Sequence, residues 1–279
     1  MSAVAIAHEA PQVYIDLLKK VLTRFIAQEE FAEIIYNRRS WQERVFAPVK
    51  ALLATKGYVM CRRQPFDVHA RTHGLDWPPA AETMVGLRRL ENIEHCVKQA
   101  LADQVPGDLV ETGVWRGGSC ILMRGILKAY GIADRSVWLA DSFAGLPQST
   151  HHEDAHWDFE KYRQLAVSME QVQDNFRKYD LLDEQVRFLK GWFKDTLPTA
   201  PIERIAVLRL DGDLYESTWD AISALYPRLS VGGYLIVDDY GGIDSCRKAI
   251  TDYRDQHGVR EPIRTVDQSG VFWRRAAPA

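Results

Sequence analysis

Residues 108–131 read DLVETGVWRGGSCILMRGILKAYG, and this stretch decides the fold. Residues 108–110 predict a short buried strand, and the apolar run from Ser119 predicts a helix that ends at Gly131. Three glycines between them predict a tight turn, where the backbone approaches a ligand closely and the helix N-terminus offers free N–H groups. Strand, glycine turn and helix in this order are typical of the first unit of a nucleotide-binding α/β fold.

The spacing of the glycines indicates which ligand the turn binds. Gly113, Gly117 and Gly118 follow the pattern Gly-x-x-x-Gly-Gly, whereas dinucleotide binders carry Gly-x-Gly-x-x-Gly. A nicotinamide dehydrogenase is therefore disfavoured. Glu111, the acidic residue before the first glycine, suits S-adenosylmethionine, whose amino group is cationic. A purely structural turn is the alternative interpretation of this stretch alone.

Two later strand ends carry further candidates for the cofactor site. The apolar segment 136–141 predicts a second strand that ends in Asp141, where a carboxylate can accept hydrogen bonds from both ribose hydroxyls. A turn or helix-capping role is the alternative for this aspartate. A third strand ends at Gly191, and Trp192 and Phe193 follow it, placed to flank a planar ring such as adenine. Packing in the core is an equal alternative for these two aromatic residues.

Composition restricts the class of protein. The chain has 279 residues and a formal net charge of −3, so its charge favours neither a nucleic-acid nor a membrane partner. Its cysteines form no C-x-x-C pair and predict reduced thiols in a cytoplasmic protein. The apolar run at the N-terminus is too short for a signal peptide, and no segment has the length of a membrane span.

The chain before residue 107 predicts helices and no strong strand. Apolar residues at helical spacing predict an amphipathic helix over residues 11–33, and a second helix ends at Gly57. The segment 71–86 is proline-rich and irregular, and a further helix follows it. We therefore expect residues 1–106 to form an N-terminal extension and helical cap, and residues 107–279 to form the core. The cap is expected to supply acceptor contacts through Thr83 and Met84.

Pairs of aspartates end the next two predicted strands. Asp211 and Asp213 follow the apolar run IAVLRL, and Asp238 and Asp239 follow YLIV. The carboxyl ends of parallel strands meet at one edge of a sheet, so these four carboxylates are expected near the glycine turn. Clustered carboxylates repel one another unless a cation lies among them. Oxygen ligands without histidine or cysteine indicate Mg²⁺, Mn²⁺ or Ca²⁺, whereas single aspartates at strand ends are usually turn or cap residues.

A long polar connection, residues 142–168, separates the second predicted strand from the third. Long connections inside a compact domain are usually lids or disordered, and we expect residues 148–161 to be a mobile lid. His151, His152 and His156 lack a fixed helical spacing, so they are interpreted as solvated loop residues and not as metal ligands. At the C-terminal end, residues 263–276 predict two strands around a tight turn.

Six motifs in the same order make the chain similar to the macrocin O-methyltransferase family. They are YIDLLKKVLTRFI (14–26), ETGVWRGGS (111–119), ADSFAGLP (140–147), FLKGWFKDTLP (188–198), LDGDLYEST (210–218) and LIVDDYGG (235–242). The similarity covers nearly the whole chain. It implies the class I methyltransferase (Rossmann-like) fold, which is a mostly parallel seven-stranded sheet with helices on both faces and an antiparallel last strand. It also implies S-adenosylmethionine and Mg²⁺ as cofactors, and a sugar hydroxyl of a macrolide-like glycoside as acceptor.

The resemblance also assigns roles to individual residues. It implies that Asp211, Asp238 and Asp239 bind the metal. The cofactor contacts that we expect are Thr83, Met84, Glu111, Gly113, Ser119, Asp141, Ser142, Gly191, Trp192 and Asp211. A carboxylate, Asp213 or Asp211, is expected to act as general base and take the proton of the hydroxyl.

Two other functions share these features. The first is a methyltransferase of the same fold that acts on a catechol or another non-sugar diol, and the second is a non-catalytic S-adenosylmethionine-binding protein. The aspartate pairs at the ends of two predicted strands argue against the non-catalytic protein. The sequence names neither the glycoside nor the hydroxyl, and it leaves open whether Mg²⁺ or another divalent ion is used. We expect a cytoplasmic homo-oligomer, a dimer or higher.

Overall fold

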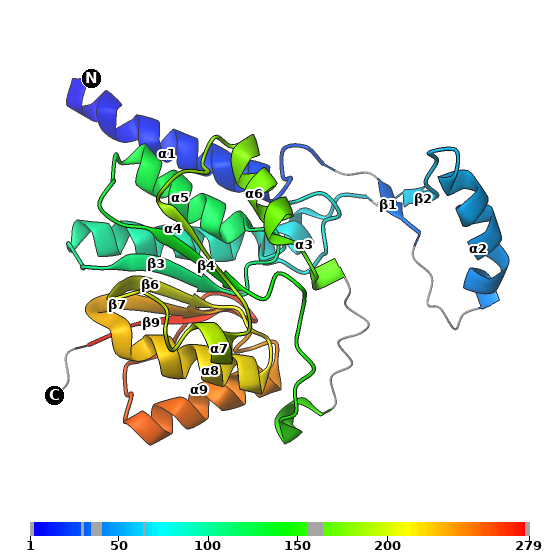
Figure 1. Ribbon diagram of the computed structural model, residues 1–279. Coiled ribbons are helices and arrows are strands. Elements are labelled where there is room, and N and C mark those ends of the chain that lie inside the picture. The colour runs from blue at the N-terminus through cyan, green and yellow to red at the C-terminus, as the bar shows by residue number, and fades with distance from the viewer. Residues whose placement is uncertain (1–2, 29–30, 35–40, 64, 156–163, 277–279) are drawn as a thin grey trace.

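The computed structural model describes residues 3–28, 31–34, 41–63, 65–155 and 164–276. Within these ranges a seven-stranded sheet lies between two layers of helices (Figure 1). The strand order is β5-β4-β3-β6-β7-β9-β8. The strands of this sheet are β3 (Asp108–Thr112), β4 (Val137–Asp141), β5 (Val186–Lys190), β6 (Ile205–Leu210), β7 (Leu229–Val237), β8 (Arg264–Thr265) and β9 (Val271–Arg274).

Most of the sheet is parallel, and its order reverses at β3. Val110 of β3 is in register with Trp138 of β4 on one side and with Leu208 of β6 on the other, both in parallel pairs. The chain therefore fills the β4–β5 side first and the β6–β7 side afterwards, which leaves a crevice at the carboxyl ends of the strands beside β3. The last strand, β9, is antiparallel to both β7 and β8. The predicted fold class is confirmed, including the terminal pair of strands.

Each face of the sheet has its own layer of helices and its own hydrophobic core. Successive residues of β6 supply both cores, because Val207 packs in one and Leu208 in the other, and every residue of this strand is buried. The helices of the first layer are α1 (Ala3–Leu22), α4 (Gly86–Ala102), α5 (Gly118–Ala129) and α6 (Met169–Lys178). The helices of the second layer are α7 (Phe193–Thr196), α8 (Tyr215–Leu225) and α9 (Asp244–His257).

The N-terminal region differs from its prediction in two respects. Helix α1 ends at Leu22 and does not continue to residue 33, because Arg24 adopts a left-handed backbone with φ of 55°. The chain then forms a two-stranded antiparallel sheet of β1 (Phe31–Glu33) and β2 (Cys61–Arg63), where no strand was predicted. Strands this short carry too few residues for a periodic pattern to be recognised.

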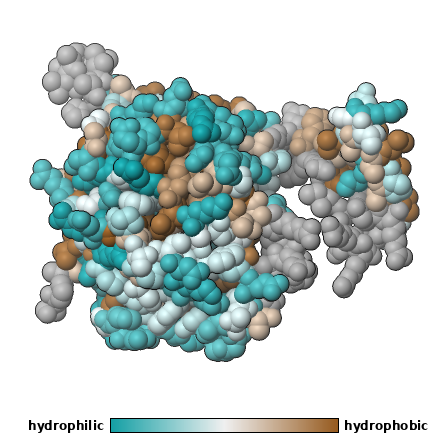
Figure 2. All heavy atoms as spheres, in the orientation of Figure 1, coloured by the Kyte–Doolittle hydropathy of each residue, from teal (hydrophilic) through white to brown (hydrophobic). Residues whose placement is uncertain are grey.

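Helix α2 (Trp41–Ala54) connects these two strands, and with them it projects to one side of the body (Figure 1). Apolar residues lie beside polar ones on the surface of this projection (Figure 2). The side chains of Val45, Val49 and Leu52 are exposed. Among the described residues of 31–63, none belongs to either hydrophobic core. The projection therefore adds little to the burial that stabilises the body.

Helix α4 connects the N-terminal region to the sheet. Leu90, Ile93 and Val97 are fully buried in the core of the first layer, and the helix contacts α5, β6 and β7. The division at residue 106 stays a prediction, since this helix shares its core with the sheet. Among the helices of the described part, none has the length and apolar character needed to cross a bilayer.

Candidate active site

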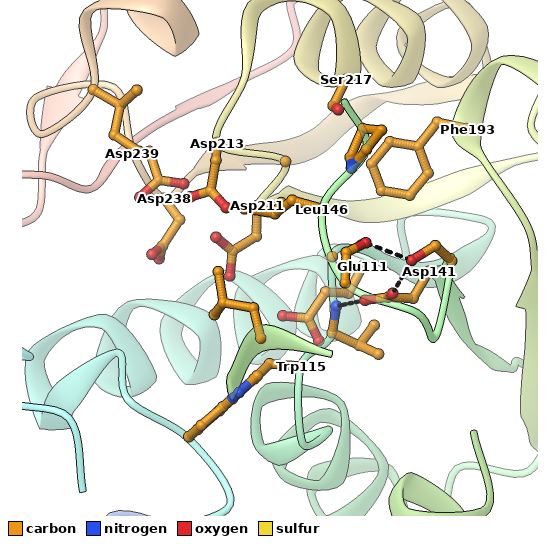
Figure 3. A pocket seen from close by; sticks show the side chains of 18 of the residues that line it. Glu111, Trp115, Asp141, Leu146, Phe193, Asp211, Asp213, Ser217, Asp238 and Asp239 are labelled. Atoms are coloured by element: carbon orange, nitrogen blue, oxygen red, sulfur yellow. Dashed lines mark hydrogen bonds between the residues drawn. The ribbon is translucent and has the colours of Figure 1, made fainter. Parts of the chain in front are cut away.

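A cavity of about 530 Å³ opens at the carboxyl ends of β3, β4, β6 and β7 (Figure 3). Every residue that the sequence predicts for the cofactor, the metal or catalysis lines this cavity. These residues are Thr83, Met84, Glu111, Gly113, Ser119, Asp141, Ser142, Gly191, Trp192, Asp211, Asp213, Asp238 and Asp239. Their individual roles stay predictions, because a common cavity fixes where they lie and not what each of them binds.

The first glycine of the turn lies where the ends of β3 and β6 meet. Gly113 has a φ of 82°, and its N–H donates to the carbonyl of Ala140 at 2.9 Å. A Cβ at this position would lie 1.8 Å from the carbonyl oxygen of Asp211. Both the backbone conformation and the available space therefore require glycine, which lets the ends of β3 and β6 pack closely together.

The start of helix α5 lies against the segment that precedes α4. The N–H of Gly118 donates to the carbonyl of Glu82 at 3.0 Å, and a Cβ on Gly118 would lie 2.6 Å from that of Thr83. This close contact brings Thr83 and Met84 to the cavity, although they are distant in sequence from the glycine turn. Ser119 is buried in the first turn of the same helix.

Asp141 organises the glycine turn from the end of β4. Its carboxylate accepts a hydrogen bond from the N–H of Val114 at 2.7 Å and another from the N–H of Phe143 at 2.8 Å. Burial raises the pKa of this carboxyl, and these hydrogen bonds oppose the rise. Asp141 therefore does form the turn contacts that the alternative interpretation predicted. A carboxylate has enough acceptor positions to bind the ribose hydroxyls as well, and that contact stays a prediction.

Glu111 lies deeper in the cavity and is almost fully buried. Arg209 forms an ion pair with one of its carboxylate oxygens, and the thiol of Cys120 donates to the other at 2.7 Å. Burial raises the pKa of Glu111 to about 7, and the guanidinium of Arg209 limits the rise.

Three carboxylates form a compact group at the ends of β6 and β7. One oxygen each of Asp211, Asp213 and Asp239 lie within 4.8 Å of one another. Burial raises the pKa of all three, that of Asp213 to about 7, and neighbouring carboxylates add to the effect. The Oδ2 atom of Asp239 is buried and finds no hydrogen-bond partner among the described residues. An unpartnered buried oxygen among carboxylates fits a hard divalent cation.

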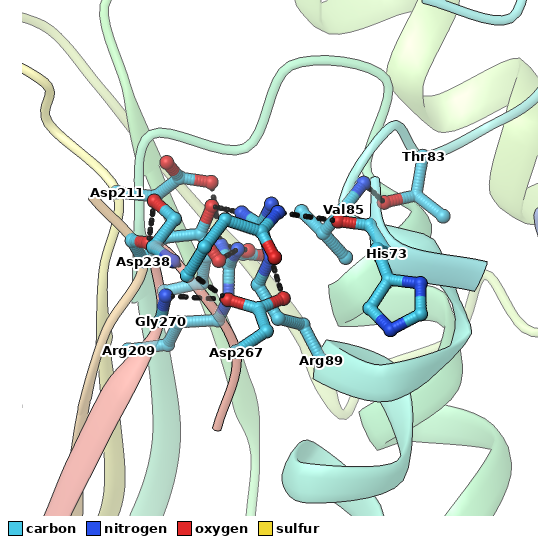
Figure 4. Close-up of polar contacts among 12 residues, drawn as sticks. His73, Thr83, Val85, Arg89, Arg209, Asp211, Asp238, Asp267 and Gly270 are labelled. Atoms are coloured by element: carbon cyan, nitrogen blue, oxygen red, sulfur yellow. Dashed lines mark hydrogen bonds and ion pairs between the residues drawn. The ribbon is translucent and has the colours of Figure 1, made fainter. Parts of the chain in front are cut away.

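Asp238 differs from its three neighbours because arginines contact both of its oxygens (Figure 4). Arg209 reaches it from β6 and Arg89 from α4, and Arg89 also contacts Asp267 of the C-terminal hairpin at 3.0 Å. Burial alone would raise the pKa of Asp238, but the two guanidinium groups outweigh it and hold the pKa below its ordinary value. The carboxylate is therefore ionised, and its role as a metal ligand stays a prediction.

The sequence interpretation missed both arginines. Arg209 is 1% exposed although it lies in the middle of an apolar strand, and an arginine within IAVLRL was the only available signal. No local sequence pattern indicated a role for Arg89, because its partners Asp238 and Asp267 are far from it in sequence.

The histidines of the long connection lie away from the acidic group. The ring of His151 stacks on that of Tyr215 with centroids 4.0 Å apart, and His152 is exposed. His156 lies outside the described residues. Within the described part of the chain, the group of Asp211, Asp213 and Asp239 is the one set of potential ligands with metal-binding spacing.

Comparison with known proteins identifies relatives over most of the chain. Residues 11–275 match the family model described as Macrocin-O-methyltransferase (TylF). Mycinamicin III 3''-O-methyltransferase of Micromonospora griseorubida is 48% identical over 272 residues, which are 95% of this chain and 97% of that protein. Demethyldecarbamoylnovobiocin O-methyltransferase of Streptomyces niveus is 56% identical over 220 residues, which are 77% of this chain and 83% of that protein.

The fold agrees with these matches. The solved structure of the O-methyltransferase NovP is similar with a TM-score of 0.81 at 46% sequence identity, and the match covers 96% of this chain and 100% of that chain. The similarity in sequence, the similarity in fold and the cavity at the switch point all agree with the prediction from the sequence motifs. The chain is therefore an O-methyltransferase, and it belongs to the macrocin O-methyltransferase family.

Proposed function

We propose that this enzyme transfers a methyl group from S-adenosylmethionine to a sugar hydroxyl of a glycosylated natural product, with the help of a divalent metal ion. The observation that carries the proposal is the acidic group of Asp211, Asp213 and Asp239, which lines the same cavity as the glycine turn. The names of the relatives support the reaction class, since one is named for 3''-O-methylation of mycinamicin III. The other is named for O-methylation of demethyldecarbamoylnovobiocin.

The methyl donor is expected over the glycine turn. Gly113 lines the cavity there, and Asp141 would accept hydrogen bonds from the ribose hydroxyls. Trp192 lines the cavity and is 38% exposed, so part of its side chain remains available to an adenine. Glu111, whose carboxylate neighbours a guanidinium, would receive the cationic amino group of the donor.

Asp211, Asp238 and Asp239 would hold the metal. The unpartnered Oδ2 of Asp239 is a ready ligand, and Asp238 is kept ionised by Arg89 and Arg209. Each carboxylate oxygen has a second lone pair, so the arginine contacts of Asp238 leave room for a ligand bond. A bound Mg²⁺ would act as a Lewis acid that lowers the pKa of a sugar hydroxyl.

Asp213 would be the general base. One of its oxygens lies within 4.8 Å of oxygens of Asp211 and Asp239, so an acceptor hydroxyl held beside those residues is close to this carboxylate. An Oδ atom of Asp213 then takes the hydroxyl proton as the oxygen attacks the methyl carbon. The sulfonium loses its positive charge in the transfer, so no developing negative charge has to be stabilised at the donor.

The proposal is tested with a labelled methyl donor and a panel of deoxysugar glycosides, with catechols as the second class of acceptor. We expect label in a sugar O-methyl group, and we expect EDTA to abolish the transfer and added Mg²⁺ to restore it. Turnover of catechols without turnover of any glycoside would contradict the proposed acceptor. The cytoplasmic location and the homo-oligomeric state stay predictions.

A further inference from the structure

Helix α8 is capped by a residue from a distant segment. Leu214, which precedes the helix, is apolar and makes no side-chain bond to the first turn. Asp154, which belongs to the short helical turn η1 (His152–Asp154), replaces such a cap. Its Oδ1 accepts the N–H of Tyr215 at 2.8 Å, and its Oδ2 accepts the N–H of Glu216 at 3.2 Å. Asp154 is only 2% exposed, so its carboxylate is committed to these donors.

Further contacts fasten the same segment to α8 and α9. The hydroxyl of Ser149 lies 2.7 Å from Asp154 Oδ2 and 3.0 Å from Glu216 Oε2. The hydroxyl of Ser245, at the start of α9, donates to the carbonyl of Glu153 at 3.2 Å. With the stacking of His151 on Tyr215, these contacts fix the described part of the segment against the ends of two helices.

The first turn of α8 follows closely after Asp213, the proposed general base. Asp213 has a φ of 59°, a left-handed conformation that is unfavourable for a residue other than glycine. The N–H of Leu214 donates to the carbonyl of Gly212 at 2.6 Å, which makes the turn tight. Such a conformation persists only where the surroundings hold it. Asp154 binds the two backbone groups that follow this turn.

The same segment borders the cavity. Gln148 and Thr150 line it together with Glu216 and Ser217 of α8, on the side of the acidic group. The cap of α8 therefore lies next to Asp213 in the chain and next to this part of the cavity wall. The glycine turn follows β3 and Asp141 ends β4, whereas α8 follows β6, which is on the other side of β3 in the sheet.

We propose that Asp154 is a positioning residue for methyl transfer, which holds the first turn of α8 and through it the orientation of the Asp213 carboxylate. The inference rests on the proposed function, in that Asp213 is the group that acts on the acceptor. It predicts an effect on kcat and on the acceptor, and no effect on the affinity for the methyl donor. Because losing a helix cap corresponds to roughly a twofold to thirtyfold change in an equilibrium constant, we expect kcat to fall about tenfold in Asp154→Ala.

The test compares Asp154→Ala, Asp154→Asn and Ser168→Ala in the full chain. Ser168 is the matched control, because its hydroxyl caps α6 by accepting the N–H of Gln171 at 3.2 Å and it does not line the cavity. The measurements are kcat, KM for the acceptor, Kd for S-adenosylmethionine by calorimetry, and hydrogen exchange of residues 213–218. Asp154→Asn keeps one oxygen for the N–H of Tyr215, so it should recover part of the activity that alanine loses.

We expect Asp154→Ala to speed exchange at residues 213–218 and to lower kcat with the donor Kd unchanged, while Ser168→Ala changes exchange only in α6. The proposal is overturned if kcat of Asp154→Ala stays within twofold of the parent, or if exchange at residues 213–218 is unaltered. It is also overturned if Ser168→Ala lowers kcat equally. The comparison uses whichever acceptor the parent methylates. A parent active on catechols alone would refute the proposed sugar acceptor and would leave this comparison intact.

Discussion

The carbonyl oxygen of Asp211 occupies the space that any side chain on Gly113 would need, because a Cβ there would lie only 1.8 Å from it. The contact joins the ends of β3 and β6, and the N–H of Asp211 also donates to the carbonyl of Thr112 at 2.9 Å. The glycine turn and the first acid of the acidic group therefore share one backbone junction. A side chain added at Gly113 would therefore have to displace the backbone of Asp211.

This junction predicts the effect of Gly113→Ala. The added methyl group must displace the backbone of Asp211, and the residue must also keep a φ of 82°. We expect a loss of about 2–5 kcal/mol in unfolding free energy, from overpacking and left-handed strain together. Urea denaturation measures this loss. The control is Gly131→Ala, since Gly131 has a φ of 67° but no atom near its Cβ position. Equal losses in the two variants would contradict the role of the Asp211 contact.

The second prediction concerns Asp141 and the methyl donor. Asp141→Ala should weaken binding of S-adenosylmethionine, because each charge-assisted hydrogen bond lost costs about 1.5–3 kcal/mol. Calorimetry with S-adenosylhomocysteine and its 2′,3′-dideoxy analogue separates the ribose contact from the turn contacts at Val114 and Phe143. The parent should discriminate between the two ligands, and Asp141→Ala should not. A parent that binds both equally would exclude the ribose role.

The third prediction concerns the metal and the base. Asp211→Asn, Asp238→Asn and Asp239→Asn should lose affinity for Mn²⁺, used as a paramagnetic probe, and should lose turnover by orders of magnitude. Asp213→Asn should lose turnover while it keeps Mn²⁺ affinity. Asp238→Asn and Asp239→Asn should bind the methyl donor nearly as well as the parent, whereas Asp211→Asn also removes an expected donor contact. Loss of Mn²⁺ affinity in Asp213→Asn, with retention in Asp238→Asn, would exchange the roles of these two residues. Full activity after exhaustive chelation would exclude a metal.

The fourth prediction concerns the ion pair of Lys19 with Glu94, which joins α1 to α4 at 2.5 Å. Burial alone would raise the pKa of Glu94, but the hydrogen bonds from Lys19 and Gln12, together with the charges of Lys19 and Lys98, outweigh it and lower the pKa. A carboxyl with a lowered folded-state pKa stabilises the fold above its unfolded pKa and loses this contribution as the pH falls through the folded value. Glu94→Gln should therefore lower the unfolding free energy at pH 7 by about 1–3 kcal/mol.

The pH dependence provides the check on this pair. The difference between the parent and Glu94→Gln, measured by urea denaturation, should shrink as the pH falls below the ordinary glutamate value of 4.5. Asp174→Asn is the control, because the pair of Asp174 with Arg177 is largely exposed and contributes less than about 0.5 kcal/mol. A difference that stays constant down to pH 3 would contradict the assigned titration.

Local sequence patterns predicted those parts of the fold that depend on neighbouring residues. The apolar run of β6 predicted a buried strand, and the acids that follow it were predicted at the right edge of the sheet, because a parallel sheet allows one arrangement of strand ends. Contacts between distant residues left no such pattern. The ion pairs of Arg89 with Asp238 and Asp267, and the cap that Asp154 provides for α8, depend on the final packing alone.

The segment predicted to be a lid contains one such contact. Mobility of residues 148–161 stays a prediction, and Asp154 within this segment is buried and bonded to α8. Residues 156–161 lie outside the described residues. Polarity alone did not reveal this contact, because an aspartate that caps a distant helix has the same composition as a solvated one.

The reversal of strand order at β3 has a consequence for how such an enzyme diversifies. Most of the expected donor contacts lie at the ends of β3, β4 and β5, whereas the four aspartates follow β6 and β7 on the other side of β3, and among these four Asp211 alone is also an expected donor contact. Mutations that reshape the acceptor side can therefore accumulate while the donor side is inherited unchanged. A lineage built on this sheet can acquire new acceptors without evolving a new way to hold its methyl donor.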